Sequence, residues 1–285
     1  MSYALLIGVD DLRVNLRRGR WAVFDCRFDL KAPEAGQQAY AAGHVPGARY
    51  ADLARDLSGA VASDTGRHPL PDTRELGLFL SRCGVTSETQ VVAYDDHGGA
   101  YAARLWWLLR WLGHERVAVL DGGLAAWRAA GLALSTDRSR PTAGKASSFG
   151  AAHDSCWLDT AALSDALARR SVCLLDAREP ERYRGEIEPI DPVAGHIPGA
   201  RSVPYRGNLD ANGRFLDARA LRERFAAELA GQAPEQVVHM CGSGVTACQN
   251  ILAMEVAGLS GSKLYPGSWS AWISDPQRPV ARGPD

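Results

Sequence analysis

Short apolar runs alternate with longer stretches of helix-forming residues along the whole chain. The short runs are typical of buried strands and lie at 21–25, 117–120, 172–176 and 237–240. The longer stretches predict helices at 72–82, 101–112, 124–130, 160–170 and 218–229. Strands that alternate with helices predict a mostly parallel sheet with helices on both faces, an α/β fold. Such sheets bind ligands at the carboxyl ends of their strands.

The chain contains two copies of one pattern. Residues 21–25 and 172–176 are both apolar runs ending in an acid, and GHVPGAR at 43–49 returns as GHIPGAR at 195–201. Two further matches follow in the same order, QVVAYDDHGG with QVVHMCGSGV and LDGGLAAW with YPGSWSAW. Such ordered self-similarity indicates a duplication. It predicts domains at 1–134 and 156–285, with a Ser/Thr/Gly/Ala-rich linker at 135–155.

The duplication places Asp95 opposite Cys241, so only the second copy has the cysteine. Cys241 follows the run 237–240 and precedes a glycine-containing loop and a helix expected from Ala247. Unpaired amides at a helix N-terminus favour an anion, which lowers a thiol's pKa and produces a sulfur nucleophile. The alternative is a buried structural cysteine. Gly242 and Gly244 favour the interpretation of Cys241 as a nucleophile over that of a structural cysteine. Glycines weaken a packed element, and they are common where the backbone must turn tightly.

Composition and charge narrow the classes of protein and of binding partner that fit this chain. The 285 residues are 46% hydrophobic, enough for two domains with cores. A net charge of −1 indicates neither nucleic acid nor a membrane as partner, and we find no membrane-spanning run or secretory signal. The six cysteines form no CxxC pair, so neither a metal site nor a disulfide framework is expected, and the predicted location is cytoplasmic.

The loop CGSGVTAC, both GH(I/V)PGAR elements and the duplication resemble the two-domain rhodanese-like sulfurtransferases, in particular their mercaptopyruvate branch. The resemblance implies tandem rhodanese-like α/β domains, with an inactive first domain carrying Asp95 and a catalytic second domain. It implies that Cys241 takes sulfur from a small anionic donor, 3-mercaptopyruvate or thiosulfate, and forms a persulfide. The acceptor would be cyanide or a thiol, including a thioredoxin-like protein. No metal or organic cofactor is expected.

The resemblance also implies roles for individual residues. Ser243 and His68 would handle protons, Arg182 would bind the donor's anionic group, and the loop residues Gly242, Gly244, Val245 and Thr246 would hold the terminal sulfur. The acid of that proton set is replaced by Ala54, with Asp52 and Asp56 nearby. We expect structural roles for Arg178, Arg184, His44 and His196, and for Cys248 either packing or redox pairing with Cys241.

Donor choice and reaction class leave alternatives. Ile190 stands where mercaptopyruvate enzymes carry a further arginine, whose loss removes about 1.5–3 kcal/mol; yet the Gly242-Ser243 pair lacks the basic residues of thiosulfate-preferring rhodaneses. We expect mercaptopyruvate-type chemistry with measurable thiosulfate activity. The alternatives are a thiosulfate-preferring rhodanese and a non-catalytic persulfide carrier or regulatory module. The loop does not match that of a cysteine phosphatase, because the arginine with which those enzymes bind phosphate would stand at position 247, where this chain has Ala247.

Overall fold

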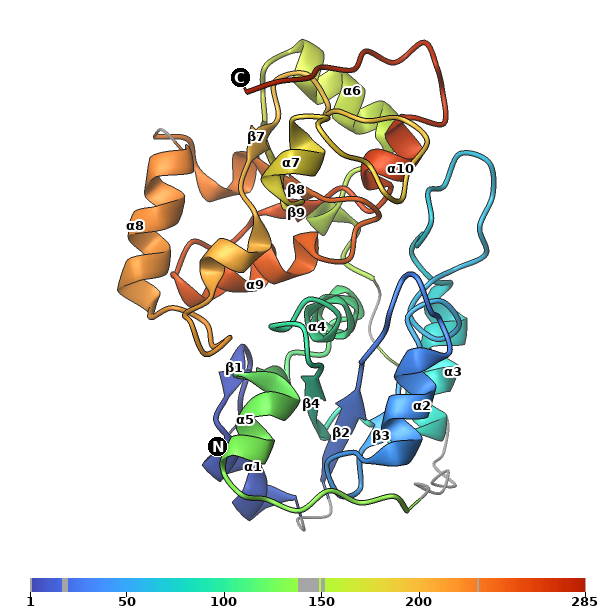
Figure 1. Cartoon of the computed structure of the whole chain (residues 1–285), viewed down its shortest axis with the longest axis vertical. Coiled ribbons are helices and arrows are strands. Elements are labelled where there is room, and N and C mark those ends of the chain that lie inside the picture. Colours follow the sequence, from blue (N-terminus) through green and yellow to red (C-terminus); the bar gives the residue numbers. More distant parts are fainter. Residues whose placement is uncertain (1, 17–19, 138–148, 150–151, 230, 285) are drawn as a thin grey trace. The chain divides into compact units, whose positions relative to one another are not determined.

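The computed structural model describes residues 2–16, 20–137, 149, 152–229 and 231–284 (Figure 1). The chain divides into two compact units. Unit 1 comprises Met1–Gly59, Pro71–His153 and Ala211–Phe215, and unit 2 comprises Ala60–Leu70, Asp154–Asp210 and Leu216–Asp285. Each unit therefore includes a short segment from the other half of the sequence. Most of the predicted linker at 135–155 lies outside the described residues.

Unit 1 is built on a five-stranded sheet in the order β1-β5-β4-β2-β3, and its pairs are parallel. The strands are β1 (Leu6–Ile7), β2 (Trp21–Asp25), β3 (Arg49–Tyr50), β4 (Gln90–Tyr94) and β5 (Val117–Leu120). Successive strand residues point to opposite faces, and every residue of β4 and β5 is buried, so helices cover both faces. These helices are α1 (Val9–Asn15), α2 (Ala35–Ala42), α3 (Thr73–Arg82), α4 (Ala102–Trp111) and α5 (Gly123–Ala129) (Figure 1).

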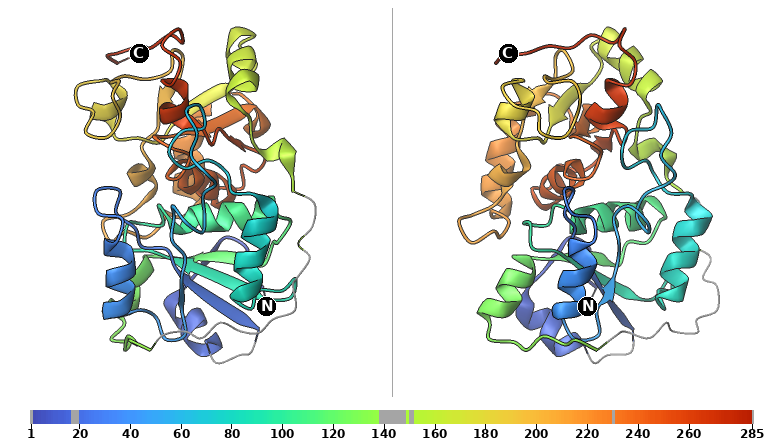
Figure 2. Two further views of the ribbon diagram at one scale, coloured as in Figure 1. Left: turned by 90° about the vertical axis from the view of Figure 1, so that its right-hand side faces the viewer. Right: turned by 45° about the vertical axis from the view of Figure 1, so that its right-hand side comes forward.

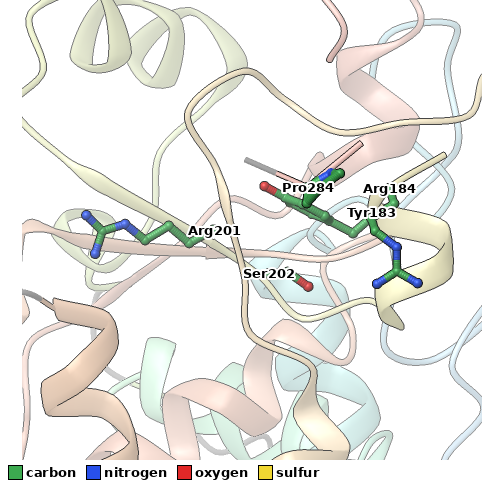
Figure 3. A pocket seen from close by; sticks show the side chains of 5 residues that line it. All are labelled: Tyr183, Arg184, Arg201, Ser202 and Pro284. Carbon is green, nitrogen blue, oxygen red and sulfur yellow. The ribbon is translucent and has the colours of Figure 1, made fainter. Parts of the chain in front are cut away.

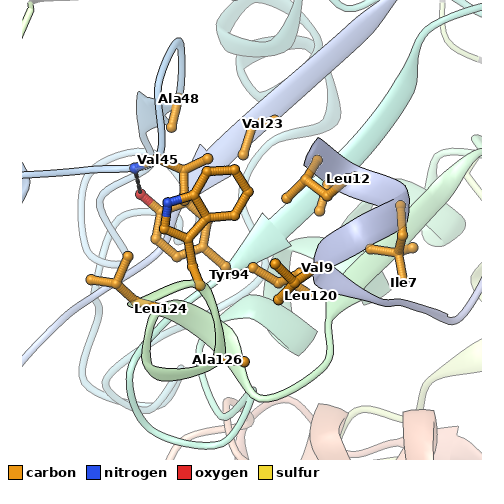
Figure 4. Close-up of a cluster of buried hydrophobic side chains, with 13 residues drawn as sticks. Ile7, Val9, Leu12, Val23, Val45, Ala48, Tyr94, Leu120, Leu124 and Ala126 are labelled. Carbon is orange, nitrogen blue, oxygen red and sulfur yellow. Dashed lines mark hydrogen bonds between the residues drawn. The ribbon is translucent and has the colours of Figure 1, made fainter. Parts of the chain in front are cut away.

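A buried aromatic joins the unit 1 core to the first GHVPGAR element. Tyr94 lies among aliphatic side chains from the sheet, α1 and α5 (Figure 4). Its hydroxyl donates to Asp25 Oδ2 at 2.7 Å and accepts the Val45 N–H at 3.1 Å. A buried phenol needs such partners, and here they fix the turn against the strand ends.

Unit 2 repeats the architecture with a four-stranded parallel sheet in the order β7-β6-β8-β9. Its strands are β6 (Cys173–Asp176), β7 (Arg201–Ser202), β8 (Val237–Met240) and β9 (Lys263–Leu264). Its helices are α6 (Thr160–Ala168), α7 (Pro180–Tyr183), α8 (Ala218–Leu229), α9 (Ala247–Val256) and α10 (Ser268–Trp272). Asp176 pairs with Met240 in register, so β6 and β8 end together beside Cys241.

The predicted elements are confirmed, with small differences at their ends. Asp72 caps α3 as expected, because its Oδ1 accepts the N–H groups of Arg74 at 2.9 Å and Glu75 at 3.1 Å. The helix predicted at 160–170 ends at Ala168 instead, because Arg170 takes the left-handed conformation with φ of 53° that commonly closes a helix.

The aromatic helix α4 packs on β4 and β5. Its tryptophans Trp106, Trp107 and Trp111 are buried, which confirms them as core residues. In the described part of the chain, no helix has the length and apolar character needed to cross a bilayer.

Candidate active site

Cys241 lies directly after β8, at the carboxyl end of the unit 2 sheet, and α9 begins six residues later at Ala247. Its loop is fastened to α10 through the main chain. The Cys241 N–H donates to Ser268 Oγ at 3.0 Å, and the carbonyl groups of Cys241 and Gly242 accept the N–H groups of Trp269 and Ser270, both at 3.0 Å. These bonds fix where the sulfur points.

Hydrogen-bond donors surround the Cys241 sulfur, although the residue is only 2% exposed. The Val245 N–H donates to Sγ at 3.3 Å. Burial alone would raise the pKa of Cys241, but hydrogen bonds from the Thr246 side chain and from the amides of Ser243, Ala247 and Val245 outweigh it and lower the pKa. Hydrogen bonds of this kind favour the thiolate form of a buried thiol over the neutral form.

The loop requires glycine at position 244. Gly244 has a φ of 73°, and a β-carbon there would lie 2.4 Å from the carbonyl oxygen of Pro266. Any other side chain would both strain the backbone and collide with it. The resulting curl is what turns the Val245 amide toward the sulfur.

The predicted pair of Ser243 and His68 is brought together in unit 2. His68 comes from the first half of the sequence, but its segment Ala60–Leu70 belongs to unit 2. Its Nδ1 lies 2.7 Å from Ser243 Oγ, and both side chains are buried. Asp52 and Asp56 lie in unit 1 and accept local backbone N–H groups, so the acid of this set stays a prediction.

Arg182 lies beside the loop and is held by two carboxylates. It is the last-turn basic residue of α7, and its Nη2 lies 2.7 Å from Glu188 Oε1 and 3.1 Å from Asp191 Oδ2. Both carboxylates are nearly fully buried. Burial raises the pKa of Asp191, and neighbouring Glu188 adds to this while Arg67, Arg182 and Arg178 oppose it.

Sequence reasoning missed Arg67, which precedes His68 and forms an ion pair with Asp191. Its N–H donates to Ser270 Oγ at 3.1 Å, so the segment is tied to the same helix that holds the loop. Figure 2 shows this segment, in light blue, running past α10, in red. In the sequence, the only sign that Arg67 lies at this site is its position directly before His68.

Residues expected to be structural have structural contacts. Arg178 forks onto Asp176 with Nη2–Oδ2 at 2.6 Å, and Arg27 binds Asp25 at the same distance in unit 1. His196 stacks on Tyr183 with ring centroids 3.8 Å apart, as His44 stacks on Tyr40 at 4.0 Å in unit 1. Arg184 pairs with exposed Glu186, and the Cys248 thiol donates to the Gly244 carbonyl at 3.4 Å.

A cavity of about 300 Å³ opens elsewhere in unit 2. It is lined by Tyr183, Arg184, Arg201, Ser202 and Pro284. In Figure 3 the guanidinium groups of Arg184 and Arg201 point away from each other, so they form no converging anion site. The residues predicted for catalysis do not line this cavity.

Comparisons with known proteins agree with the two copies. The chain matches the Rhodanese-like domain family over residues 8–130 and 159–275. It is 50% identical over 285 residues to a Pseudomonas aeruginosa protein named as a probable 3-mercaptopyruvate sulfurtransferase, covering 99% of this chain and 100% of that protein. It is 41% identical over 264 residues to a Mycobacterium tuberculosis protein provisionally named a thiosulfate sulfurtransferase, covering 92% and 91%. The structure of 3-mercaptopyruvate sulfurtransferase from Leishmania major superposes with a TM-score of 0.80 at 32% identity, covering 93% of this chain and 73% of that one.

Proposed function

The chain belongs to the family of rhodanese-like sulfurtransferases, and from this membership we propose that it moves sulfur from a small anionic donor to a nucleophilic acceptor through a persulfide on Cys241. One observation carries the proposal: the amides of Ser243, Val245 and Ala247 converge on the Cys241 sulfur and lower its pKa. Such donors stabilise a thiolate before reaction and a persulfide anion after it.

The reaction balances in two half-reactions. The Cys241 thiolate attacks the donor's sulfur: with 3-mercaptopyruvate the carbon–sulfur bond breaks and pyruvate enolate leaves, and with thiosulfate the sulfur–sulfur bond breaks and sulfite leaves. The terminal persulfide sulfur is then attacked by cyanide or a thiolate. That step gives thiocyanate or a new persulfide and returns the Cys241 thiolate.

His68 and Ser243 supply the proton that one donor needs. The enolate leaving 3-mercaptopyruvate must gain a proton at carbon, and a 2.7 Å contact between His68 Nδ1 and Ser243 Oγ beside the nucleophile can relay it. Sulfite leaves without carbon protonation. The pair therefore favours 3-mercaptopyruvate as the principal donor, with thiosulfate as a slower one.

The remaining roles follow from this scheme. Arg182 binds the donor's carboxylate or sulfonate end, the loop backbone from Gly242 to Thr246 holds the terminal sulfur, and unit 1 is catalytically silent because Asp95 cannot carry sulfur. The cytoplasmic location expected from the cysteine pattern, the thioredoxin-like acceptor and the domain limits 1–134 and 156–285 stay predictions.

Steady-state thiocyanate release tests the proposal with both donors on wild type, Cys241→Ser and His68→Ala. We expect turnover by wild type and none by Cys241→Ser. We expect His68→Ala to lower kcat about 10²-fold for 3-mercaptopyruvate. With thiosulfate as the donor, the loss of kcat should be several-fold smaller. Persulfide formation without thiocyanate release would identify the carrier alternative, and equal loss with both donors would refute the proton relay.

A further inference from the structure

We propose that Asn208 is a positioning residue for the reaction of Cys241. Through a buried network of amide side chains it holds the first turn of α9, and thereby aims the backbone amide of that turn at the sulfur. The proposal deepens the function proposed above for Cys241 and rests on it. It concerns three amide side chains that are 0% exposed, so no substrate reaches them: Asn208, Gln249 and Asn250.

The side-chain amide of Asn208 joins two residues of the first turn of α9. Its Nδ2 donates to Gln249 Oε1 at 2.8 Å and to Asn250 Oδ1 at 2.6 Å. These acceptors lie two and three positions after Ala247, where α9 begins and whose N–H is one of the donors to the Cys241 sulfur. Residues this close share one turn of a helix, so the network fixes the turn that supplies this donor.

Asn208 is itself fixed by other parts of unit 2. Its Oδ1 accepts the Nε–H of Arg224, on α8, at 3.1 Å, and its carbonyl accepts the Leu216 N–H at 2.9 Å. Asn250 Nδ2 donates to the carbonyl of Val203, which directly follows β7, at 2.8 Å. A buried polar network with such bonds holds one arrangement of its side chains. The network therefore fastens the first turn of α9 to α8 and to the end of β7.

The nucleophile's loop and the helix after it thus have separate anchors. The loop is tied to α10 through the carbonyl groups of Cys241 and Gly242, and the helix is tied through the amide network. The N–H donors to the sulfur come from both parts, Ser243 and Val245 from the loop and Ala247 from the helix. Because a hydrogen bond weakens steeply as its angle worsens, all three donors act together only when loop and helix are both held.

The copy without the cysteine has charged residues where this network has amides. Matching the GH(I/V)PGAR elements places Asp56 opposite Asn208, and matching the strands before the two loops places Arg104 opposite Asn250. Asp56 pairs with Arg55 at 2.8 Å. A formal charge near a thiol shifts its pKa, whereas amide side chains hold the turn without adding one. The uncharged network therefore suits the copy that carries the nucleophile.

The pH dependence of Cys241 alkylation tests the proposal without any sulfur transfer. Iodoacetamide reacts with the thiolate, so its rate on the Cys241 peptide, followed by mass spectrometry, gives the midpoint of the thiol's titration. Asn208→Leu keeps the branched shape of the side chain and removes its donors to α9. We expect the midpoint to rise by about one pH unit, because the sulfur loses part of its stabilisation. The kcat for thiocyanate release should fall about tenfold, with KM changed little because the network does not touch the donor.

Gln90→Leu is the matched control, because it removes a buried amide from the copy without the nucleophile. Gln90 begins β4, and its Nε2 donates to the carbonyl groups of Tyr3 at 2.8 Å and Val91 at 3.1 Å. This variant should lower the melting temperature, as Asn208→Leu does, and leave the Cys241 midpoint unchanged. An equal rise of the midpoint in both variants would reflect a general loss of stability and would overturn the proposal.

Arg224→Met tests the outer end of the network on a half-buried residue, in case Asn208→Leu fails to fold. It removes the bond to Asn208 Oδ1 and leaves the two donors to α9 in place, so the midpoint should rise by a smaller amount. Unchanged midpoints in the folded variants would overturn the proposal. A raised midpoint in Asn208→Leu, together with no thiocyanate release by wild type, would reject the proposed function and retain the positioning role.

Discussion

The loops after β4 in unit 1 and β8 in unit 2 surround different side chains with the same set of backbone N–H groups. We call this set the backbone cradle. The Asp95 carboxylate accepts the N–H groups of residues two, four and six positions later, His97 and Gly99 at 2.9 Å and Tyr101 at 2.8 Å. The amides that lower the pKa of Cys241 stand at the same offsets, on Ser243, Val245 and Ala247. The two copies therefore share the N–H donors at these three offsets, and they differ in the side chain that accepts from them, Asp95 in unit 1 and Cys241 in unit 2.

The comparison separates what the backbone supplies from what the side chain supplies. The carboxylate of Asp95 permanently satisfies the unit 1 cradle, with a further bond from the Ala102 N–H at 2.8 Å. In unit 2 the cradle instead holds a sulfur that can gain and lose a second sulfur. Anion binding is therefore a property of the fold, and catalysis depends on one residue and the groups facing it.

Cys241→Asp converts the second cradle into a copy of the first and should have the largest effect. We expect thiocyanate release to fall by about 10⁴-fold or more, because a carboxylate cannot form a persulfide. The melting temperature should stay at or above that of Cys241→Ser, since the amides keep an anionic acceptor. A cooperative fold that is much less stable than Cys241→Ser would show that the two cradles are not equivalent.

Asp95→Asn tests the same cradle from the other side. The amide offers one acceptor oxygen where the carboxylate offers two, and its NH₂ faces buried N–H donors, so we expect unit 1 to lose about 3 kcal/mol of unfolding free energy. Urea unfolding measures this. Asp29→Asn is the control, because the Asp29 carboxylate accepts an exposed N–H of Lys31. A loss no larger than that of Asp29→Asn would contradict the role of the four bonds.

Thr246→Val removes a donor found only in the cysteine copy, because Ala100 occupies the matching position in unit 1. The hydroxyl helps to lower the pKa of Cys241. Since the thiolate reacts, wild type should keep its iodoacetamide rate as pH falls below the ordinary thiol range, down to the lowered pKa. The variant should lose about tenfold at neutral pH and match wild type at high pH.

Thr160→Val is the control for that pH profile, because its hydroxyl bonds Tyr265 and not the cysteine. Its profile should overlay that of wild type. Parallel profiles for Thr246→Val and wild type would show that the backbone amides alone set the pKa.

Ile190→Arg should have the smallest effect of these substitutions. It adds a cation to the expected donor site beside Cys241, a site for which unit 1 has no use. We expect KM for 3-mercaptopyruvate to fall about threefold, a modest gain because Arg182 already supplies a cation. Ile187→Arg adds the same charge to an exposed position of the same loop, 54% exposed, and should change KM less. Equal effects from both would indicate a general field and no specific contact.

Local pattern predicted the elements and the nucleophile, because strand, loop and cap residues are neighbours in sequence. The Asp72 cap, the strand 237–240 and the glycine loop all follow from short-range rules. The position of Arg67 did not, because it lies beside Gly242 although it comes from the other half of the sequence. The carboxylates on Arg182 were also missed, since Glu188 and Asp191 lie in an irregular loop whose spacing indicates no contact.

Segment Ala60–Leu70 has a consequence for how this gene can evolve. It belongs to unit 2 and delivers both His68 and Arg67, although it is encoded in the half that lacks the cysteine. In return, Ala211–Phe215 belongs to unit 1, where the Phe215 N–H binds Asp121 Oδ1 at 2.9 Å. Neither half of the sequence can therefore be deleted alone without removing a segment of the unit that the other half builds.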